Sequence, residues 1–565
     1  MKSRTLLTAA ALGAALVLAC APRVAVRKPA YDYSKMDKES ARIHKKVEAL
    51  IDECFTRREP LPLGPGVRIL SLLHEPERKT LAVTFNRNFS YPPFRPGNVR
   101  ATYARLRELL GGKYREYSIT LWSQGVPIEA LIPNAFRNGS GQWDLRRMAA
   151  QNPRPEAVIR RISRPLQPSQ GLLNRTIDVR PSHGWYYNST IDRWEWQRPR
   201  LFQTVEDLLP FSFTTFYLIP MLENAGAVVF TPRERDIQTR EVVVDNDAPG
   251  SGYRESGPGW RSGEGAGFAP GHPPYQVNHN PFLQGSHRLC AADSAGGSLA
   301  QWVPEIPADG DYAVYISWRH GPEQVSDALY TVHHAGGATR FLVNQQIGGS
   351  TWIYLGTFRF LQGSRPEGGS VELSSRSATP GRLISADAVR FGGGMGNILR
   401  NGSVSGKPRF AEGSKYYLQY AGLPDTLIYN LYGGRDDYRD DYNSRSEYLN
   451  YLYGAPFGPK KNRLEPGLGI PFDLTLAFHT DAGITRSDTT IGTLSIYSYP
   501  SADSTFSFPD GVSRMANRDF ADLLQSQIVE DLGRLYDPAW NRRMLMDADY
   551  SEAMRPQVPC ALLEL

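Results

Sequence analysis

Apolar runs of strand length alternate with a helical pattern in two separate parts of the chain. Residues 174–185 resemble a strand that leads into a loop, residues 210–226 have the spacing of a helix closed by a glycine, and residues 227–232 resemble the next strand. A similar alternation returns from residue 473 onward. Nearly continuous apolar strands separated by helices are typical of a parallel sheet that is covered on both faces. The pattern therefore predicts an α/β domain with a mostly parallel sheet covered by helices.

The chain between these two parts has a different character. Residues 241–400 are rich in Gly, Pro and Ser and contain short β-type runs such as 311–318 and 352–360. Short strands at regular spacing with turn residues between them favour a β-sandwich. We therefore expect an all-β sandwich inserted into one α/β domain, which it divides into residues 172–240 and 401–565.

The sandwich segment resembles the golvesin C-terminal-like domain of bacterial extracellular proteins. The resemblance is carried by "VVVDNDAPG" (242–250), "WVPEIPADGDYAVYISW" (302–318), "ALYTVHHAGG" (328–337), "WIYLGTF" (352–358) and "ISADAVRF" (384–391). It implies the sandwich fold and leaves the ligand open. Trp302, Trp318 and Trp352 could offer a face for sugar rings, but tryptophans in strands usually pack in a core.

Residues 36–165 predict a separate α+β module before the α/β domain. Residues 41–55 and 99–112 have helical spacing, and residues 79–89 and 114–123 resemble strands. We recognise no catalytic pattern in this module, so a spacer or docking role is the default expectation.

The first residues indicate export from the cytoplasm. Two basic residues precede an apolar run, residues 6–18, which is too short to span a bilayer comfortably and is followed by Ala19 and Cys20. This arrangement resembles the bacterial lipoprotein box, which implies a signal peptide over residues 1–20, lipidation of Cys20 and a tether over residues 21–35. The expected location is the bacterial cell envelope, periplasmic or at the outer-membrane surface, with the membrane reached only through the lipid. An ordinary secretory signal is the alternative interpretation.

Charge and cysteine content narrow the possible functions. The 565 residues carry a formal net charge of +6, with 64 Lys and Arg residues spread among 58 Asp and Glu residues. Because this charge is mild and the two signs are mixed, we expect no nucleic-acid partner. Cys54, Cys290 and Cys560 are far apart and odd in number, so we expect buried reduced thiols and no disulfide framework.

Side chains of the metal-binding type stand where the predicted strands end. His183, His479 and Glu564 each follow an apolar run, and Glu206 lies just before the helix that begins near Pro210. In an open parallel sheet, ligands bind in the crevice beyond the carboxyl ends of the strands. Two histidines and a carboxylate form the ligand set of a catalytic zinc, and a further glutamate can move a proton.

These motifs resemble the zinc-dependent N-acetylmuramoyl-L-alanine amidases. The resemblance is carried by "RPSHGW" (180–185), "VEDLLP" (205–210), "LENAGAVVFTPRERD" (222–236), "AFHTDAG" (477–483) and "PCALLEL" (559–565). It implies that His183, Glu206 and His479 are zinc ligands. It further implies that Glu564 is the general base.

Two positions depart from this family, and two features have rival interpretations. Ser182 stands where the family usually has a glycine, and Asp481 where it usually has an asparagine. Asp207 is an alternative to Glu206, because the same short segment also fits a helix-capping box. Residues 435–445 form an acidic and aromatic run that could contact substrate or a cation, but a solvated loop is the preferred interpretation.

The leading hypothesis is a lipid-anchored amidase of the cell envelope. It would use Zn²⁺ to hydrolyse the amide bond between N-acetylmuramic acid and L-alanine in peptidoglycan, while the sandwich positions the enzyme on peptidoglycan or a related envelope glycan. One alternative is a catalytically inactive protein that binds envelope glycan or mediates adhesion. Another is an enzyme that acts on a different extracellular polysaccharide.

Overall fold

The computed structural model describes residues 31–565 apart from 150–154, 164–167, 169–170, 201–202, 249, 459–462 and 481–490. The chain divides into two compact units, Met1–Trp143 and Asp144–Leu565. Cys20 and Asp481 lie outside the described residues. Within these residues, no helix is long and apolar enough to cross a membrane. Three buried cysteines, Cys54, Cys290 and Cys560, are free thiols, as the sequence predicts.

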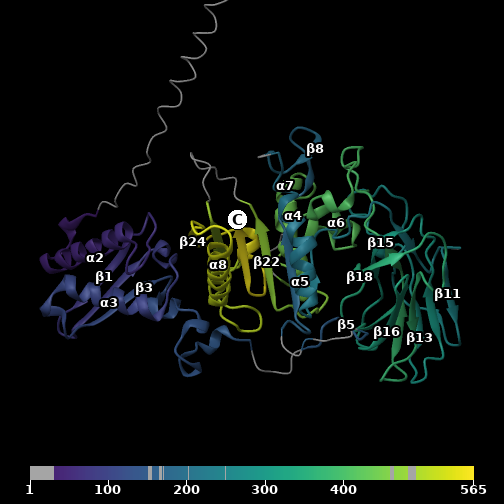
Figure 1. The fold of residues 1–565 in the computed structure, drawn as a ribbon, viewed down its shortest axis with the longest axis horizontal. Coiled ribbons are helices and arrows are strands. Elements are labelled where there is room, and N and C mark those ends of the chain that lie inside the picture. Colours follow the sequence, from purple (N-terminus) through teal and green to yellow (C-terminus); the bar gives the residue numbers. More distant parts are fainter. Residues whose placement is uncertain are drawn as a thin grey trace, which may run out of the picture. The chain divides into compact units, whose positions relative to one another are not determined.

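The smaller unit, Met1–Trp143, combines a four-stranded sheet with two long helices (Figure 1). The strand order is β1-β2-β3-β4, in which only β2 and β3 are parallel. The elements are α2 (Lys38–Arg57), β1 (Ile69–Glu75), β2 (Thr80–Phe85), α3 (Pro96–Leu110), β3 (Ser118–Ser123) and β4 (Val126–Pro127). Asp37 begins α2 by accepting hydrogen bonds from the amides of Glu39 and Ser40, as N-terminal caps do.

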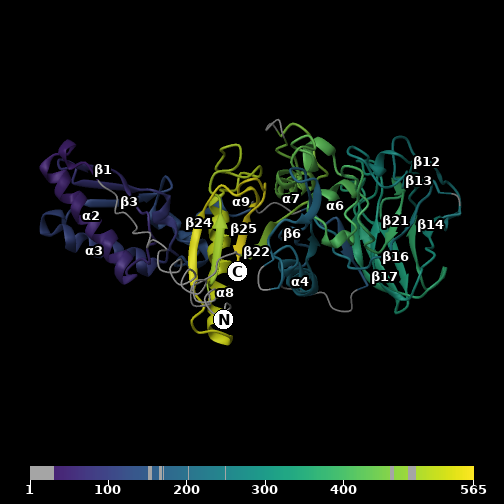
Figure 2. The same cartoon turned by 90° about the horizontal axis from the view of Figure 1, so that it is seen from above.

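A six-stranded sheet forms the centre of the α/β part of the larger unit (Figure 2). Its strand order is β24-β23-β25-β22-β6-β9, and all neighbouring pairs are parallel except β23 with β25. The strands are β6 (Thr176–Pro181), β9 (Val228–Phe230), β22 (Leu474–His479), β23 (Thr493–Tyr497), β24 (Arg542–Asp547) and β25 (Cys560–Glu564). The register pairs His479 with Glu564 and Phe478 with Pro181, so three carboxyl ends meet at one edge. The partly parallel sheet confirms the predicted α/β class in part, whereas the sequence did not predict that β23 and β24 run antiparallel to the other four strands.

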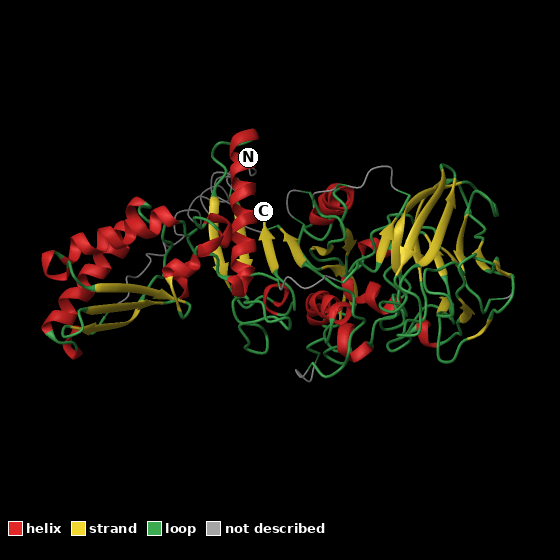
Figure 3. Ribbon diagram, turned by 90° about the horizontal axis from the view of Figure 1, so that it is seen from below, coloured by secondary structure: helices red, strands yellow, loops and turns green. Residues whose placement is uncertain are grey.

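Helices cover both faces of this sheet (Figure 3). The α-helices described in this unit are α4 (Leu209–Phe213), α5 (Ile219–Asn224), α6 (Ser414–Tyr420), α7 (Asp437–Tyr453), α8 (Met515–Leu535) and α9 (Ser551–Met554). Helices α5, α8 and α9 lie against strands of this sheet, whereas α6 packs with the core of the sandwich. Ile219 of α5 and Ala521 of α8 share one apolar cluster with Phe478 of β22. The next strand residue inward, Ala477, packs instead in the cluster that contains Ala553 of α9. Successive residues of a strand point to opposite faces, so β22 is buried on both.

The inserted segment forms a sandwich of antiparallel strands, to which β5, a strand that precedes the α/β domain in the sequence, adds one edge strand. One sheet has the order β10-β21-β15-β18, a second β11-β14-β19-β16-β17-β5, and a small third sheet β12-β13-β20. The strands are β5 (Ile159–Arg161), β10 (Val242–Val244), β11 (Tyr253–Ser256), β12 (Arg261–Ser262), β13 (Arg288–Ala291), β14 (Leu299–Trp302), β15 (Gly310–Ile316), β16 (Ala328–His334), β17 (Gly337–Val343), β18 (Ile353–Phe360), β19 (Ser370–Ser374), β20 (Leu383–Ala386) and β21 (Val389–Phe391). Trp302, Trp318 and Trp352 are at most 5% exposed, so they belong to the core and offer no sugar-binding face.

Buried polar contacts join the sandwich to the loop that follows β9. Arg390 Nη1 of β21 lies 2.6 Å from Glu234 Oε2, and both side chains are 0% exposed. Tyr315 of β15 also donates its hydroxyl to Glu234. Asp236 Oδ2 accepts a hydrogen bond of 2.8 Å from the amide of Ala313. The insertion is therefore fixed to the α/β part by specific charged and polar pairs.

The prediction that residues 435–445 form a solvated loop is wrong. Most of this run lies in helix α7, where Asp437, Asp440 and Arg445 are at most 2% exposed. Lys415 of α6 pairs with both aspartates, at 2.5 Å from Asp437 Oδ1 and 3.1 Å from Asp440 Oδ2. In the sequence the run resembles a surface segment because it is charged. Its acidic side chains are nevertheless buried, since they pair with a buried lysine instead of with water.

Candidate metal centre

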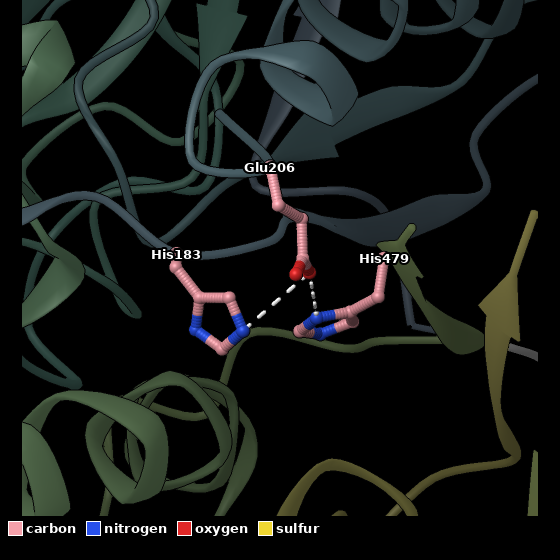
Figure 4. Close-up of side chains that lie close together, drawn as sticks. All are labelled: His183, Glu206 and His479. Carbon is pink, nitrogen blue, oxygen red and sulfur yellow. Dashed lines mark hydrogen bonds and ion pairs between the residues drawn. The ribbon is translucent and has the colours of Figure 1, made fainter. Parts of the chain in front are cut away.

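Three predicted ligands lie together at the carboxyl edge of the sheet (Figure 4). His479 Nδ1 is 3.0 Å from Glu206 Oε1, and His183 Nε2 is 3.5 Å from the same oxygen. The candidate ligand atoms of all three residues lie within 4.8 Å of one another. Both histidines are at most 5% exposed. This group, called the triad below, could hold a metal ion.

The three ligands come from separate segments that the fold brings together. His479 is the last residue of β22, and His183 follows the end of the neighbouring strand β6 by two positions. Glu206 stands in the loop before α4. Its carboxylate lies between the two imidazole rings (Figure 4). The sequence-based expectation that side chains at these strand ends converge is confirmed for these three residues.

Arg233 ties together the loops that carry His183 and Glu206. Its guanidinium is buried and donates hydrogen bonds to the carbonyl oxygens of Pro181, at 2.9 Å, and of Asp207, at 3.1 Å. The same nitrogen also donates to the carbonyl oxygen of His183. One arginine thus fixes the backbone next to two members of the triad.

The departure at Ser182 has a visible structural consequence. Ser182 has a φ of 55°, in the left-handed region that favours glycine. Its hydroxyl donates to Glu206 Oε1 at 2.7 Å. The serine therefore adopts an unfavourable backbone conformation but gains a direct hydrogen bond to a triad carboxylate.

Gly184, on the other side of His183, permits a close backbone approach. A Cβ at this position would lie 2.6 Å from the backbone carbonyl of Glu412 and from the amide nitrogen of Gly413. Real Cβ atoms do not approach backbone so closely, so a larger residue would displace one of the two segments. The glycine of the "SHGW" motif thus allows the backbone beside His183 to pack closely against the backbone of Glu412 and Gly413.

Asp207, the alternative ligand, is occupied elsewhere. Its carboxylate accepts hydrogen bonds from the backbone amides of Gln197, at 3.0 Å, and Arg198, at 3.1 Å. Burial raises the pKa of Asp207 to about 6. The structure therefore places Glu206, and not Asp207, in the triad.

Glu552 contacts the triad although sequence reasoning did not find it. Its Oε2 lies 2.9 Å from His479 Nε2 and 3.1 Å from Arg445 Nη1. Burial alone would raise the pKa of Glu552, but Arg445 and His479 lower it to about 2, so it is an anion. A carboxylate on one ring nitrogen keeps the proton there, so the other nitrogen, Nδ1, is the one that would give up its proton to bind a cation.

His479 and His183 are held in different protonation states. Burial opposes a charge on His479, but Glu552 and Glu206 outweigh it and raise the pKa of His479 to about 9. Burial, reinforced by Arg445, lowers the pKa of His183 well below its ordinary value. Arg445 Nη2 lies 2.9 Å from His183 Nδ1 and can only donate, so Nδ1 accepts and the proton of the neutral ring is on Nε2.

The triad fits a metal ion in two respects and requires one local change. His183 Nε2 is buried and has no hydrogen-bond partner among the described residues, as expected of an atom that awaits a cation. His479 has the carboxylate partner that metal-bound histidines usually have. A cation at His183 Nε2 would displace the proton from that nitrogen. The neutral ring would then carry its proton on Nδ1, which could no longer accept a hydrogen bond from Arg445.

Glu564, the predicted general base, ends β25 next to His479. The two residues are register partners on parallel strands, so both stand at the edge of the sheet where the triad lies. Glu564 is half-buried and is not a member of the triad. Cys20, the predicted lipidation site, and Asp481, where the resembled family usually has an asparagine, lie outside the described residues.

The comparisons with known proteins concern a limited part of the chain. Residues 278–393 match the family model of the golvesin C-terminal domain, which confirms the sequence-based resemblance over those residues. A xanthan lyase of Bacillus sp. (strain GL1) is 36% identical over 97 residues, which are 17% of this chain and 10% of the lyase. The chain thus matches about a tenth of the length of this curated relative.

Solved structures give similar partial matches. A Paenibacillus xanthan lyase has 25% identity and a TM-score of 0.22, covering 27% of this chain and 13% of that one. A family 35 carbohydrate-binding module from Clostridium thermocellum has 11% identity and a TM-score of 0.17, covering 27% of this chain and 97% of that one. His183, Glu206 and His479 all lie outside the segment that matches the golvesin family.

Proposed function

We propose that the protein is a zinc-dependent hydrolase of the bacterial cell envelope that cleaves the amide bond between N-acetylmuramic acid and L-alanine in peptidoglycan. The observation that carries this proposal is the triad, in which two histidines and a glutamate converge at the carboxyl edge of the sheet. Two histidines and one carboxylate are the ligand set of catalytic zinc sites with an open position. The choice of the amide bond as the bond that is cleaved rests on the resemblance of the surrounding motifs to the amidases.

The triad residues and their partners would each have a distinct part. His183 Nε2, His479 Nδ1 and the Glu206 carboxylate would hold the ion. A bound zinc ion supplies Lewis acidity for the amide carbonyl and lowers the pKa of a bound water to about 7. Glu552 orients the His479 ring, and Arg445 neutralises Glu552 behind it.

Glu564 is the glutamate best placed to move protons. Its carboxylate would take a proton from the attacking water and give it to the leaving nitrogen. Glu552 is unsuited to that part, because His479 and Arg445 both bind its carboxylate and keep it ionised. Glu564 ends its strand as the register partner of His479, at the edge of the sheet where the triad lies.

Metal analysis and a cleavage assay test the proposal together. The purified full chain is expected to contain about one zinc and to release peptides with new amino termini from purified peptidoglycan. His479→Ala should lose the metal and the activity, whereas Glu564→Gln should keep the metal and lose turnover. Full activity in either variant would remove that residue from the mechanism.

A second candidate function is favoured by the partial identity to xanthan lyase. That relative is named for action on a polysaccharide, and it shares 36% identity over 97 residues with this chain. We propose as the alternative that the protein binds an extracellular polysaccharide or acts on it. Purified protein that leaves peptidoglycan intact but binds or degrades an anionic polysaccharide such as xanthan would establish this alternative.

A further inference from the structure

A second group of oxygen-bearing side chains lies within the sandwich. The segments "VVVDNDAPG" and "ISADAVRF" meet there, because β10 pairs with β21. Val244 pairs with Val389, Asp245 is the first residue after β10, and Asp387 stands two positions before β21. The pairing of the first and last strands therefore brings Asp245 and Asp387 to the same end of the sandwich.

Asp245 is unusual because it is buried and only the backbone amides of its own neighbours, Asn246 and Asp247, lie near enough to its carboxylate to lower its pKa. It is 1% exposed, and neither carboxylate oxygen accepts a hydrogen bond of ordinary geometry within the described part of the chain. The side-chain oxygen of Asn246 is also buried and unpartnered there. An ionised carboxylate that is buried in this way costs several kcal/mol, so it must take up either a proton or a cation.

The neighbouring aspartates add negative charge and receive only neutral donors. Asp387, also 1% exposed, accepts hydrogen bonds from the amide of Phe268 at 3.0 Å and from the hydroxyl of Ser317 at 2.9 Å. Asp247 accepts from the amide and, at 2.5 Å, from the hydroxyl of Ser286. These hydrogen bonds orient the carboxylates and leave their charge uncompensated.

The electrostatics of the group agree with this geometry. Burial first, and then the charges of Asp387 and Asp247, raise the pKa of Asp245 to about 8. Burial likewise raises the pKa of Asp387 to about 7. Ionising both carboxylates at neutral pH is unfavourable unless a positive charge lies beside them.

We propose that Asp245, Asn246 and Asp387 bind a calcium ion that stabilises the sandwich. Carboxylate and amide oxygens are the ligands that Ca²⁺ prefers, whereas the imidazoles of the triad suit zinc. The ion joins the loops that follow the first strand and precede the last strand of the insertion. Because it binds the folded state only, it raises the stability of the sandwich. This site does not depend on the proposed hydrolase activity.

The test measures calcium binding by the full chain after treatment with a chelator. Added Ca²⁺ should raise the melting temperature, with half of the effect at or below about 1 mM. Tb³⁺, which takes the same ligands, should luminesce on excitation of Trp302, whose indole nitrogen donates to the carbonyl oxygen of Asp387 at 2.9 Å. Asp245→Asn should lower the affinity at least tenfold and should melt in chelator at or above the wild-type temperature, because it removes a buried charge.

Matched variants separate this site from other effects. Asp311→Asn, an exposed acid on β15, should respond to Ca²⁺ like the wild type. His479→Ala, which disrupts the triad, should also keep the response. If Asp245→Asn does not fold, Asn246→Ala is the milder substitution and should also weaken binding. A wild type whose melting temperature ignores Ca²⁺, or an Asp245→Asn variant that responds equally, overturns the proposal.

Discussion

His479 Nε2 lies 2.9 Å from Glu552 Oε2, and the same oxygen lies 3.1 Å from Arg445 Nη1. Arg445 in turn contacts His183 Nδ1 at 2.9 Å and Asp441 Oδ2 at 2.6 Å. Helices α7 and α9 therefore supply a buried charged layer behind both histidines of the triad. This layer favours the charged form of His479, and it favours a neutral His183 that carries its proton on Nε2.

The first prediction concerns the glutamate in this layer. Glu552→Gln should weaken metal binding by about 10- to 100-fold, because the His479 ring loses the carboxylate that orients it. Titration of the chelator-treated variant with Zn²⁺ measures the effect. Glu447→Gln is the control, since Glu447 is equally buried but binds the amide of Phe457 and Arg555. Equal affinities in the two variants would show that Glu552 has no special relation to the metal.

The second prediction uses two substitutions of Ser182. Both Ser182→Gly and Ser182→Ala remove the hydrogen bond to Glu206, but only glycine relieves the left-handed backbone. The glycine variant should be more stable than the alanine variant by about 1 kcal/mol. Denaturant unfolding of the metal-free proteins measures the difference. An alanine variant that matches the glycine variant would show that the backbone here is unstrained.

A third prediction concerns close packing at Gly184. Gly184→Ala should destabilise the protein by about 1–3 kcal/mol and weaken metal binding, because the added Cβ meets the backbone of Glu412 and moves His183. Gly533→Ala is the matched control in helix α8, where a Cβ would meet nothing within 4 Å. That control should be stabilised by about 0.5–1 kcal/mol. Similar results for both variants contradict the packing argument.

The ion pair between the sandwich and the α/β part gives a fourth prediction. Glu234→Gln should cost about 3–5 kcal/mol of stability, because Arg390 remains buried without its counter-charge. Replacing both residues, as in Glu234→Leu with Arg390→Met, should recover most of that loss. Asp531→Asn, which breaks an exposed pair with Arg534, should change little. A neutral effect of Glu234→Gln would mean that this pair does not hold the insertion.

The fifth prediction is a pH dependence that arises from Asp236. Burial, followed by the charge of Glu234, raises the pKa of Asp236 from 3.8 to about 6. The folded state therefore binds this proton more tightly, and its stabilising effect is complete below pH 4 and is lost as the pH rises to about 6. The loss amounts to about 3 kcal/mol. Asp236→Asn should remove this component from the pH profile of unfolding, whereas Asp311→Asn should leave the profile unchanged.

The strand-end residues could be predicted because their pattern is local. The run before His479 is apolar, the run before His183 is a buried strand that also holds the Asp178–Arg180 ion pair, and parallel strands bring their carboxyl ends together. Glu552 could not be found in this way, since it lies inside the four-residue helix α9 and not at the end of a strand; the preceding strand, β24, already ends at Asp547. Arg445 was missed because an acidic run with arginines resembles a surface, and only the packing of Lys415 and Glu552 around α7 buries it.

The position of the sandwich within the chain has a consequence for how the centre is assembled. Glu206 and His479 are 273 residues apart, and the whole insertion lies between them. The ribosome therefore synthesises the whole sandwich segment before His479, the third ligand, leaves it. The first and last strands of the insertion pair with each other, Val242 with Phe391, so the two halves of the α/β domain leave it at adjacent points. Capture of the metal would then be a late event that marks a chain whose insertion has already folded.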